Sequence, residues 1–240
     1  MAALHPSPPF DELTYHPTSR WIRGTRHGAT VIDSRHALLV WEPGKKVPIY
    51  AFPAEDVALS ADDDAASVGV RRVDDPDLAG YVTLPWEAVE QWYEEDEEVF
   101  VHPRDPFVRV DALRSSRHVR VERDGQLLAE SDTPILVFET GLPTRYYLAE
   151  SDVDTAVLAD SDLRTGCPYK GFASYRDVVL DGRRHRNLFW SYQDPFGSVS
   201  RLKGRLAPYD ERVEMIVDGE LQERPAGPLG RRARSNVRAA

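Results

Sequence analysis

The stretch His118-Val-Arg-Val-Glu-Arg-Asp-Gly-Gln-Leu-Leu-Ala-Glu130 decides the fold class of this chain. Its first half alternates with period two, so Val119 and Val121 share one face, as in a half-buried strand. Asp124-Gly125 then permits the positive φ angles of a tight two-residue turn, and the apolar residues after it predict the returning strand. The stretch therefore predicts an antiparallel β-hairpin.

Short apolar segments on both sides of this hairpin predict further strands, which are separated by turns rich in glycine and proline. These segments cover residues 21–26, 29–33, 37–42, 47–52, 67–73, 99–101, 107–110, 134–139, 145–148, 175–180, 187–192, 202–206 and 213–217. Residues 83–93 differ, because Trp86, Val89 and Tyr93 share one helical face, and this spacing predicts the clearest helix. The chain is therefore expected to be mostly β or α+β: two tandem pseudo-repeats of short antiparallel strands in a compact β-rich body, with one or two short helices.

The order of the predicted segments recurs about 97 residues further along the chain. Gly28 corresponds to Gly125 and, once one residue is dropped in a turn, Tyr50 corresponds to Tyr146. Such a recurrence predicts a tandem duplication. The expected organisation is an extended N-terminal lead-in at 1–19, a first, degenerate repeat with a linker segment at 20–113, a second, complete repeat at 114–220 and a disordered arginine-rich tail at 221–240.

The net charge of −10 has the wrong sign for a nucleic-acid-binding body, which should neutralise phosphates. The arginines of the last twenty residues could contact an acidic partner, but their surroundings favour a disordered end. No apolar run approaches the roughly 18 to 20 residues of a membrane span, and no secretory signal is visible. The single cysteine excludes an intrachain disulfide. These features predict a cytoplasmic protein without nucleic-acid or membrane partners, and they leave the cofactor and the oligomeric state open.

Two motifs in the second half of the chain, Gly141-Leu-Pro-Thr-Arg-Tyr-Tyr147 and Cys167-Pro-Tyr-Lys-Gly171, are its most distinctive. With His102-Pro-Arg-Asp-Pro106 and Trp190-Ser-Tyr192, they resemble the DUF427 family, a bacterial and fungal domain of unknown function. The resemblance covers about residues 20–218 and implies a compact β-rich domain. The first repeat lacks both of the first two motifs, so the second repeat and the linker segment are expected to supply most of any site.

The family also carries a nucleotidyltransferase-like label, for which this sequence shows no catalytic motif. Such an enzyme needs metal-binding carboxylates that converge on a phosphate site, and Asp62, Asp63 and Asp64 are adjacent rather than spaced for that role. Glycine-rich nucleotide cradles of the Gly-x-Gly-x-x-Gly and Walker types are absent from the sequence as well. A nucleotidyltransferase is therefore only the third hypothesis.

Cys167 precedes Pro168 in a predicted turn. Lys170 and Arg145 could supply the positive charge that favours a thiolate, which nucleophilic or redox chemistry requires. Alternatively, Cys167 is a small buried hydrophobic residue under the turn. The sequence contains no Cys-x-x-Cys or His-x-x-x-His pair, so no metal site is expected.

Arg145 lies next to Tyr146 and Tyr147. The planar guanidinium can bind a carboxylate or phosphate through two hydrogen bonds, and tyrosines offer a flat wall with a polar tip. This combination predicts a pocket for a small anionic or aromatic ligand. The alternative is that Arg145 pairs with Glu139 or Asp152 inside the fold.

His102 and Asp105 could perform acid–base chemistry in the linker segment, or they could belong to an ion-pair network that locks it. The candidate catalytic residues are therefore Cys167, Lys170, His102 and Asp105, and the candidate ligand-binding residues are Arg145, Tyr146, Tyr147, Tyr169, Arg104 and Trp190. The main hypothesis is that a small polar or anionic metabolite is bound or processed near the junction of the repeats. The alternative is a non-catalytic protein-interaction module, and whether the chain is an enzyme is left open.

Overall fold

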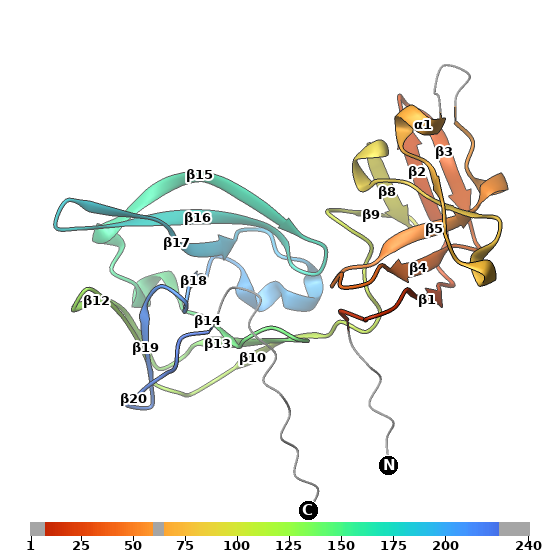
Figure 1. Ribbon diagram of the computed structural model, residues 1–240. Coiled ribbons are helices and arrows are strands. Elements are labelled where there is room, and N and C mark those ends of the chain that lie inside the picture. The colour runs from red at the N-terminus through yellow and green to blue at the C-terminus, as the bar shows by residue number, and fades with distance from the viewer. Residues whose placement is uncertain (1–7, 60–64, 226–240) are drawn as a thin grey trace, which may run out of the picture. The chain divides into compact units, whose positions relative to one another are not determined.

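The computed structural model describes residues 8–59 and 65–225, and the chain divides into two compact units, Met1–Pro106 and Phe107–Ala240 (Figure 1). Throughout the described residues, the named strands pair antiparallel with their neighbours and the helices are short. The predicted β-rich fold class is confirmed.

The first unit contains short strands and single helical turns. They are β1 (Thr14–Pro17), β2 (Ile22–Arg26), β3 (Ala29–Ser34), β4 (Leu38–Trp41), β5 (Ile49–Pro53), η1 (Ala54–Asp56), α1 (Ala65–Val68), β6 (Arg71–Arg72), η2 (Pro76–Leu78), β7 (Tyr81–Thr83), η3 (Trp86–Ala88), β8 (Gln91–Glu94) and β9 (Glu97–Val99). One sheet has the order β1-β4-β5-β7-β6 and the other has the order β3-β2-β8-β9. The residues expected to form a lead-in thus include the edge strand β1.

Both sheets of the first unit contribute to one aromatic-rich core. Trp41 of β4, Phe52 of β5 and Trp92 of β8 are all almost completely buried. The rings of Phe52 and Trp92 stack with their centroids 6.1 Å apart. Large buried rings of this kind contribute strongly to stability, so the core explains how short strands can hold the unit together.

The helix predicted over residues 83–93 is wrong. The segment holds the turn η3 and the strand β8, in which Trp92 pairs with Gly24 of β2 and with Val99 of β9. The side chain of Trp92 is buried in the core. Helical spacing is only a weak local preference, and the strand pairing together with the burial of Trp92 outweighs it.

The second unit contains a set of longer strands. Its elements are β10 (Val110–Arg114), β11 (Val119–Arg123), β12 (Gln126–Ser131), β13 (Ile135–Glu139), β14 (Arg145–Tyr147), η4 (Glu150–Asp152), η5 (Thr155–Val157), β15 (Leu158–Cys167), β16 (Gly171–Leu180), β17 (Arg183–Tyr192), η6 (Gly197–Leu202), β18 (Leu206–Pro208), β19 (Glu214–Val217) and β20 (Glu220–Leu221). The three sheets have the orders β10-β13-β14, β12-β11-β19-β20 and β15-β16-β17-β18. Figure 1 shows β15, β16 and β17 as a long arched meander.

Several predicted boundaries differ from the structure. Residues 65–68 are helical, and the strand expected at 67–73 is reduced to β6. The strand expected at 202–206 begins only at Leu206, because η6 extends to Leu202 and a turn follows it. Of the expected arginine-rich tail, Leu221 belongs to β20, and residues 226–240 lie outside the described residues.

The strand β15 was not predicted from the sequence. It is an edge strand whose side chains are mostly exposed, so it lacks the alternating apolar pattern of a half-buried strand. The turn Pro168-Tyr-Lys170 connects it to β16, which begins at Gly171 with a φ angle of +100°. A Cβ atom at Gly171 would lie 3.1 Å from the backbone oxygen of Asp194. Only glycine therefore suits this position.

The sheet β10-β13-β14 has two different faces. Its inner face carries Ala112, Ile135, Val137 and Tyr147, which pack in a core with residues of β16 and β17. Residues that pair directly across antiparallel strands point to the same side. By this rule the opposite face, here called the outer face, carries Asp111, Leu113, Leu136, Phe138 and Tyr146. Leu136 is buried and Tyr146 packs against the core around Val119, whereas Leu113 and Phe138 are exposed.

The two units share a pattern of strand pairing. The order β1-β4-β5 in the first unit matches β10-β13-β14 in the second, and β3-β2-β8-β9 matches β12-β11-β19-β20. The hydroxyl of Ser34 donates to Asp56 Oδ2, and the hydroxyl of Ser131 donates to Asp152 Oδ2, both at 2.6 Å. We call residues at the same register position of the two units counterparts.

Candidate functional site

Arg145 lies on the inner face of β14, where two acids hold it. Its guanidinium donates to both carboxylate oxygens of Glu211, at 3.0 and 2.5 Å, and Nη1 lies 3.5 Å from Asp210 Oδ2. Its Cζ also lies 5.6 Å from the ring centroid of Trp190. Burial alone would lower the pKa of Arg145, but the hydrogen bond to Glu211 and the charge of Asp210 raise it. The guanidinium is thus an internal structural cation.

These ion pairs differ from the ones considered for Arg145 on sequence grounds. Glu139 pairs instead with Lys170, and Asp152 accepts its hydrogen bond from Ser131. Asp210 and Glu211 were missed because they follow β18, far from Arg145 in sequence. Their position as an acidic pair between two strands was the only signal that could have drawn attention to them.

Asp210 has an unusual environment for a carboxyl group. It is 5% exposed, and its Oδ1 atom has no hydrogen-bond partner among the described residues. Burial and the charge of Glu211 raise its pKa to about 7, although Arg145 acts in the opposite direction. A carboxyl group that titrates near neutrality can serve as a general acid or base. Asp210 is therefore a candidate acid–base group of the second unit.

Tyr147 and Trp190, two of the predicted ligand-binding residues, meet inside the second unit. Trp190 Nε1 donates to Tyr147 Oη at 2.8 Å, and the two rings are perpendicular with centroids 6.0 Å apart. Burial raises the pKa of Tyr147 far above its ordinary value, and Glu139 and Cys167 add to this effect. Both rings belong to the buried core behind the inner face.

Lys170 and Cys167 lie at the hairpin turn between β15 and β16. The ammonium group of Lys170 forms a short ion pair with Glu139 Oε2, and both side chains are largely buried. Cys167 is the half-buried last residue of β15 and pairs in register with Gly171. Tyr169, in the same turn, is half-buried. The structure thus pairs Lys170 with Glu139. It places Cys167 close enough to Tyr147 and Tyr192 to raise the pKa of both.

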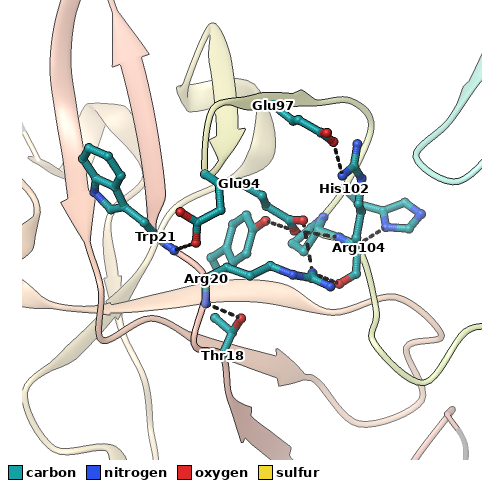
Figure 2. A network of polar contacts seen from close by, with 10 residues as sticks. Thr18, Arg20, Trp21, Glu94, Glu97, His102 and Arg104 are labelled. Atoms are coloured by element: carbon teal, nitrogen blue, oxygen red, sulfur yellow. Dashed lines mark hydrogen bonds and ion pairs between the residues drawn. The ribbon is translucent and has the colours of Figure 1, made fainter. Parts of the chain in front are cut away.

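The other predicted residues, His102, Arg104 and Asp105, follow β9 in the first unit. His102 Nδ1 lies 2.7 Å from the carbonyl oxygen of Pro103, and Asp105 is buried. Arg104 donates through Nη1 to Glu97 Oε2 at 3.0 Å, as Figure 2 shows. The ten predicted site residues are therefore divided between the two units, with seven in the second.

A buried carboxylate, Glu94, organises the polar network of the first unit. It is 4% exposed and accepts hydrogen bonds from Tyr50 Oη at 2.7 Å and from the backbone nitrogen of Arg104 at 3.2 Å. Arg20 Nη1 lies 3.1 Å from its other oxygen, and Figure 2 shows Arg20 pointing toward Glu94. Burial raises the pKa of Tyr50 well above its ordinary value, and Glu94 adds to this effect. The network therefore gives both carboxylate oxygens of Glu94 a polar partner.

The outer face of the second unit ends in an open groove of about 280 Å³. Its lining residues are Arg109, Asp111, Phe138, Glu139, Thr140, Leu142 and Thr144. Arg109 is 81% exposed, and its Nε lies 2.8 Å from Asp111 Oδ2. The Phe138 side chain is 43% exposed. The groove thus combines a solvent-exposed cation, an apolar ring and hydroxyl groups, and none of its lining residues is among the ten predicted site residues.

Within residues 8–59 and 65–225, no group of three or more His, Cys, Asp or Glu side chains could hold a metal ion. Asp62, Asp63 and Asp64 lie outside these ranges. Over the same described part of the chain, no helix is both long and apolar enough to cross a membrane.

Comparison with protein families matches residues 111–219 to the family described as Domain of unknown function (DUF427). The matched segment runs from β10 to the end of β19 and includes Arg145, Cys167, Lys170 and Asp210. No curated protein matches the chain. The segment from residue 111 to residue 219, within the second unit, therefore matches the DUF427 family.

Proposed function

We propose that the second unit binds a small polar or anionic metabolite in the groove at the end of its outer face. The observation that carries this proposal is the exposure of Phe138 beside Arg109, whose guanidinium is held by a surface ion pair with Asp111. Exposed ion pairs contribute little free energy, so a ligand can displace one at low cost. Arg109 can then bind a carboxylate or phosphate of the ligand through two hydrogen bonds.

The size and lining of the groove fit a small metabolite better than a nucleotide. Its volume of about 280 Å³ lies just below the range typical of small-molecule pockets. Phe138 of β13 offers an apolar surface to the groove. The half-buried Thr144, which directly precedes β14, adds a hydroxyl group to the same lining. In this proposal Arg109, not Arg145, binds the anionic group of the ligand, because Glu211 and Asp210 already hold the guanidinium of Arg145.

Native mass spectrometry of the full chain purified from its own host tests the proposal. The matched variants are Arg109→Ala and Arg114→Ala, since both arginines are exposed and belong to or adjoin β10. We expect a small-molecule adduct in the wild type and in Arg114→Ala, and its loss in Arg109→Ala. A bare mass in the wild type, or an equal adduct in all three proteins, would argue against the groove.

A second function, a non-catalytic interaction module, is favoured by a different observation. Leu113 and Phe138, 48% and 43% exposed, both belong to the outer face. Exposed apolar groups that gather on one face are typical of protein-interaction surfaces. Size-exclusion chromatography with light scattering separates the two functions. A self-associating module gives a dimer that Leu113→Ser dissociates, whereas a metabolite-binding unit stays monomeric in both forms.

The proposal also covers the organisation of the chain. We interpret the first unit as a degenerate copy of the second, related to it by tandem duplication. The shared strand order and the matching Ser34–Asp56 and Ser131–Asp152 hydrogen bonds support this interpretation. The catalytic roles of Cys167, Lys170, His102 and Asp105 and a cytoplasmic location stay predictions from the sequence.

A further inference from the structure

In the first unit, the chain's own side chains occupy the surroundings of Tyr50. The hydroxyl group of Tyr50 donates to Glu94, and Arg20 forms an ion pair with the same carboxylate. On its ring side, Tyr50 stacks on Trp86, with centroids 6.3 Å apart and planes 27° apart. A carboxylate and a flat ring system thus cover one tyrosine.

The counterpart of Tyr50 in the second unit is Tyr146. Tyr50 pairs with Leu39 across β4 and β5, and Tyr146 pairs with Leu136 across β13 and β14. Tyr50 is 4% exposed, whereas Tyr146 is only half-buried. Its hydroxyl group has no hydrogen-bond partner within the part of the chain that the structure describes.

Arg20 has its counterpart in Arg117. Each of these residues follows the edge strand of its sheet, and its backbone nitrogen donates at 3.2 Å to a hydroxyl two residues earlier, in Thr18 and Ser115 respectively. The Arg117 side chain is 56% exposed, and its Nε lies 3.6 Å from Asp218 Oδ2. The second unit therefore keeps both the tyrosine and the arginine that hold the carboxylate in the first.

The carboxylate itself is missing from the second unit. Glu94 pairs with Ile22 in the first unit, and Val217 pairs with Val119 at the same position in the second. The residues that follow, Glu95 and Asp218, have nearly identical positive φ angles of 52° and 53°, which supports the alignment. Valine thus replaces the buried acid that satisfies Tyr50.

The indole ring is missing as well. In the first unit Val82 pairs with Phe52, and in the second unit Leu206 pairs with Leu148 at the same position. Trp86 lies four residues after Val82, and Asp210 lies four residues after Leu206. Asp210 is thus the counterpart of Trp86. Asp210 also acts on the pKa of Tyr146, so it lies near the same tyrosine. The second unit thus has a smaller residue than the first at both positions that cover the tyrosine.

We propose that the second unit binds a carboxylate attached to a flat ring, that is, an aromatic or heteroaromatic acid, with the carboxylate at Tyr146 and Arg117 in the position that Glu94 fills in the first unit. This position is separate from the groove beside Arg109, and neither proposal depends on the other. Glu94 and Trp86 serve as an internal template, because they show which chemical groups the Tyr–Arg pair accepts.

The charges around this position predict a specific pH dependence. Arg117 and Arg145 attract an anion, whereas Asp218, Glu211 and an ionised Asp210 repel it. Burial raises the pKa of Asp210 to about 7, so below this pH its carboxyl group is mostly neutral. The neutral group can carry its proton on Oδ1, which has no other partner among the described residues, and donate a hydrogen bond to the ligand. Binding of the acid should therefore be stronger at pH 6 than at pH 8.

The test is a titration of the full chain with benzoate, followed by two-dimensional NMR at pH 6 and pH 8. Three variants address the site: Val217→Glu installs the acid of the first unit, Tyr146→Phe removes the hydroxyl, and Arg117→Ala removes the cation. Arg114→Ala, at an exposed arginine of β10 outside both proposed sites, is the matched control, and Arg109→Ala reports on the groove. Tyr93→Phe, at a half-buried tyrosine of the first unit, controls for the loss of a phenol.

We expect benzoate to bind the wild type and both controls with equal affinity. A hydrogen bond to a charged group contributes enough for its removal to weaken binding about tenfold or more, so Tyr146→Phe and Arg117→Ala should show such a loss. Val217→Glu should abolish binding. If Val217→Glu does not fold, Tyr146→Phe still decides the test. No binding by the wild type, or equal affinity in wild type and Tyr146→Phe, would overturn the proposal. A loss in Arg109→Ala alone would also overturn it, and would assign the ligand to the groove.

Discussion

Trp41 and Phe138 are counterparts, yet Trp41 is 1% exposed and Phe138 is 43% exposed. Each is opposite the edge strand of its sheet, where Trp41 pairs with Thr14 and Phe138 pairs with Asp111. In the first unit the ring of Phe10 meets Trp41 edge-on, with centroids 5.9 Å apart. At this position the sheet face is thus buried in one unit and accessible to solvent in the other.

The stability of the two units should respond very differently to truncation of these counterparts. Trp41→Ala empties a buried site, and substitutions of this type cost about 3–5 kcal/mol. Phe138→Ala removes a half-exposed ring and should change the free energy of unfolding by about 1 kcal/mol or less. Urea unfolding of the full chain, monitored separately for each unit by NMR, checks this. A similar cost for both substitutions would show that Phe138 is a core residue.

Asp210 should make the second unit less stable as the pH rises from about 4 to about 7. Its folded pKa of about 7 exceeds its ordinary value of 3.8, so in this window the folded state holds a proton that the unfolded state has lost. The free energy of unfolding therefore falls with rising pH, by up to about 4 kcal/mol for a shift of this size. Above pH 7 no further change from this group is expected.

The variant Asp210→Asn isolates this contribution, because asparagine resembles the neutral acid in shape. Its surroundings include Arg145, Glu211 and Tyr146, which all remain in the variant. Denaturant unfolding of wild type and variant between pH 4 and pH 8 should show a difference that grows until pH 7 and then levels off. A constant difference over this range would mean that Asp210 is ionised throughout.

Removal of Arg145 should destabilise the second unit strongly. Arg145→Ala leaves two largely buried carboxylates, Asp210 and Glu211, without their cation, and a broken buried ion pair typically costs about 3–5 kcal/mol. Thermal unfolding measures this loss. The triple variant Arg145→Met, Asp210→Asn, Glu211→Gln should recover a large part of it. A loss for Arg145→Ala below about 1 kcal/mol would indicate that water already satisfies these acids.

The hairpins were predictable because their signals are local. His27-Gly28 and Asp124-Gly125 form the turns of β2–β3 and β11–β12 with positive φ angles, as their residue types indicate. The strand β8 was not predictable from local spacing, since its pairing with β2 joins residues about seventy positions apart. The polar edge strand β15 carries no local signal at all, and only its pairing with β16 defines it.

The candidate site was predictable only in part, for the same reason. Arg145 and Trp190 were named from their residue types, and the structure brings them together. The acids that hold Arg145 come from a turn 65 or 66 residues further along, a distance that no sequence motif bridges. A further signal in the sequence is Phe10, which corresponds to Phe107 at the same spacing that relates Gly28 to Gly125. Both residues precede the edge strand of their unit.

The most direct measurement of the central claim is a crystal structure of the full chain purified from its own host without dialysis against competing anions. We expect density for a small molecule over the ring of Phe138, with an acidic group within hydrogen-bond distance of Arg109 and the Arg109–Asp111 contact broken. A groove that holds only solvent while the same preparation carries a bound metabolite elsewhere on the chain would contradict the claim.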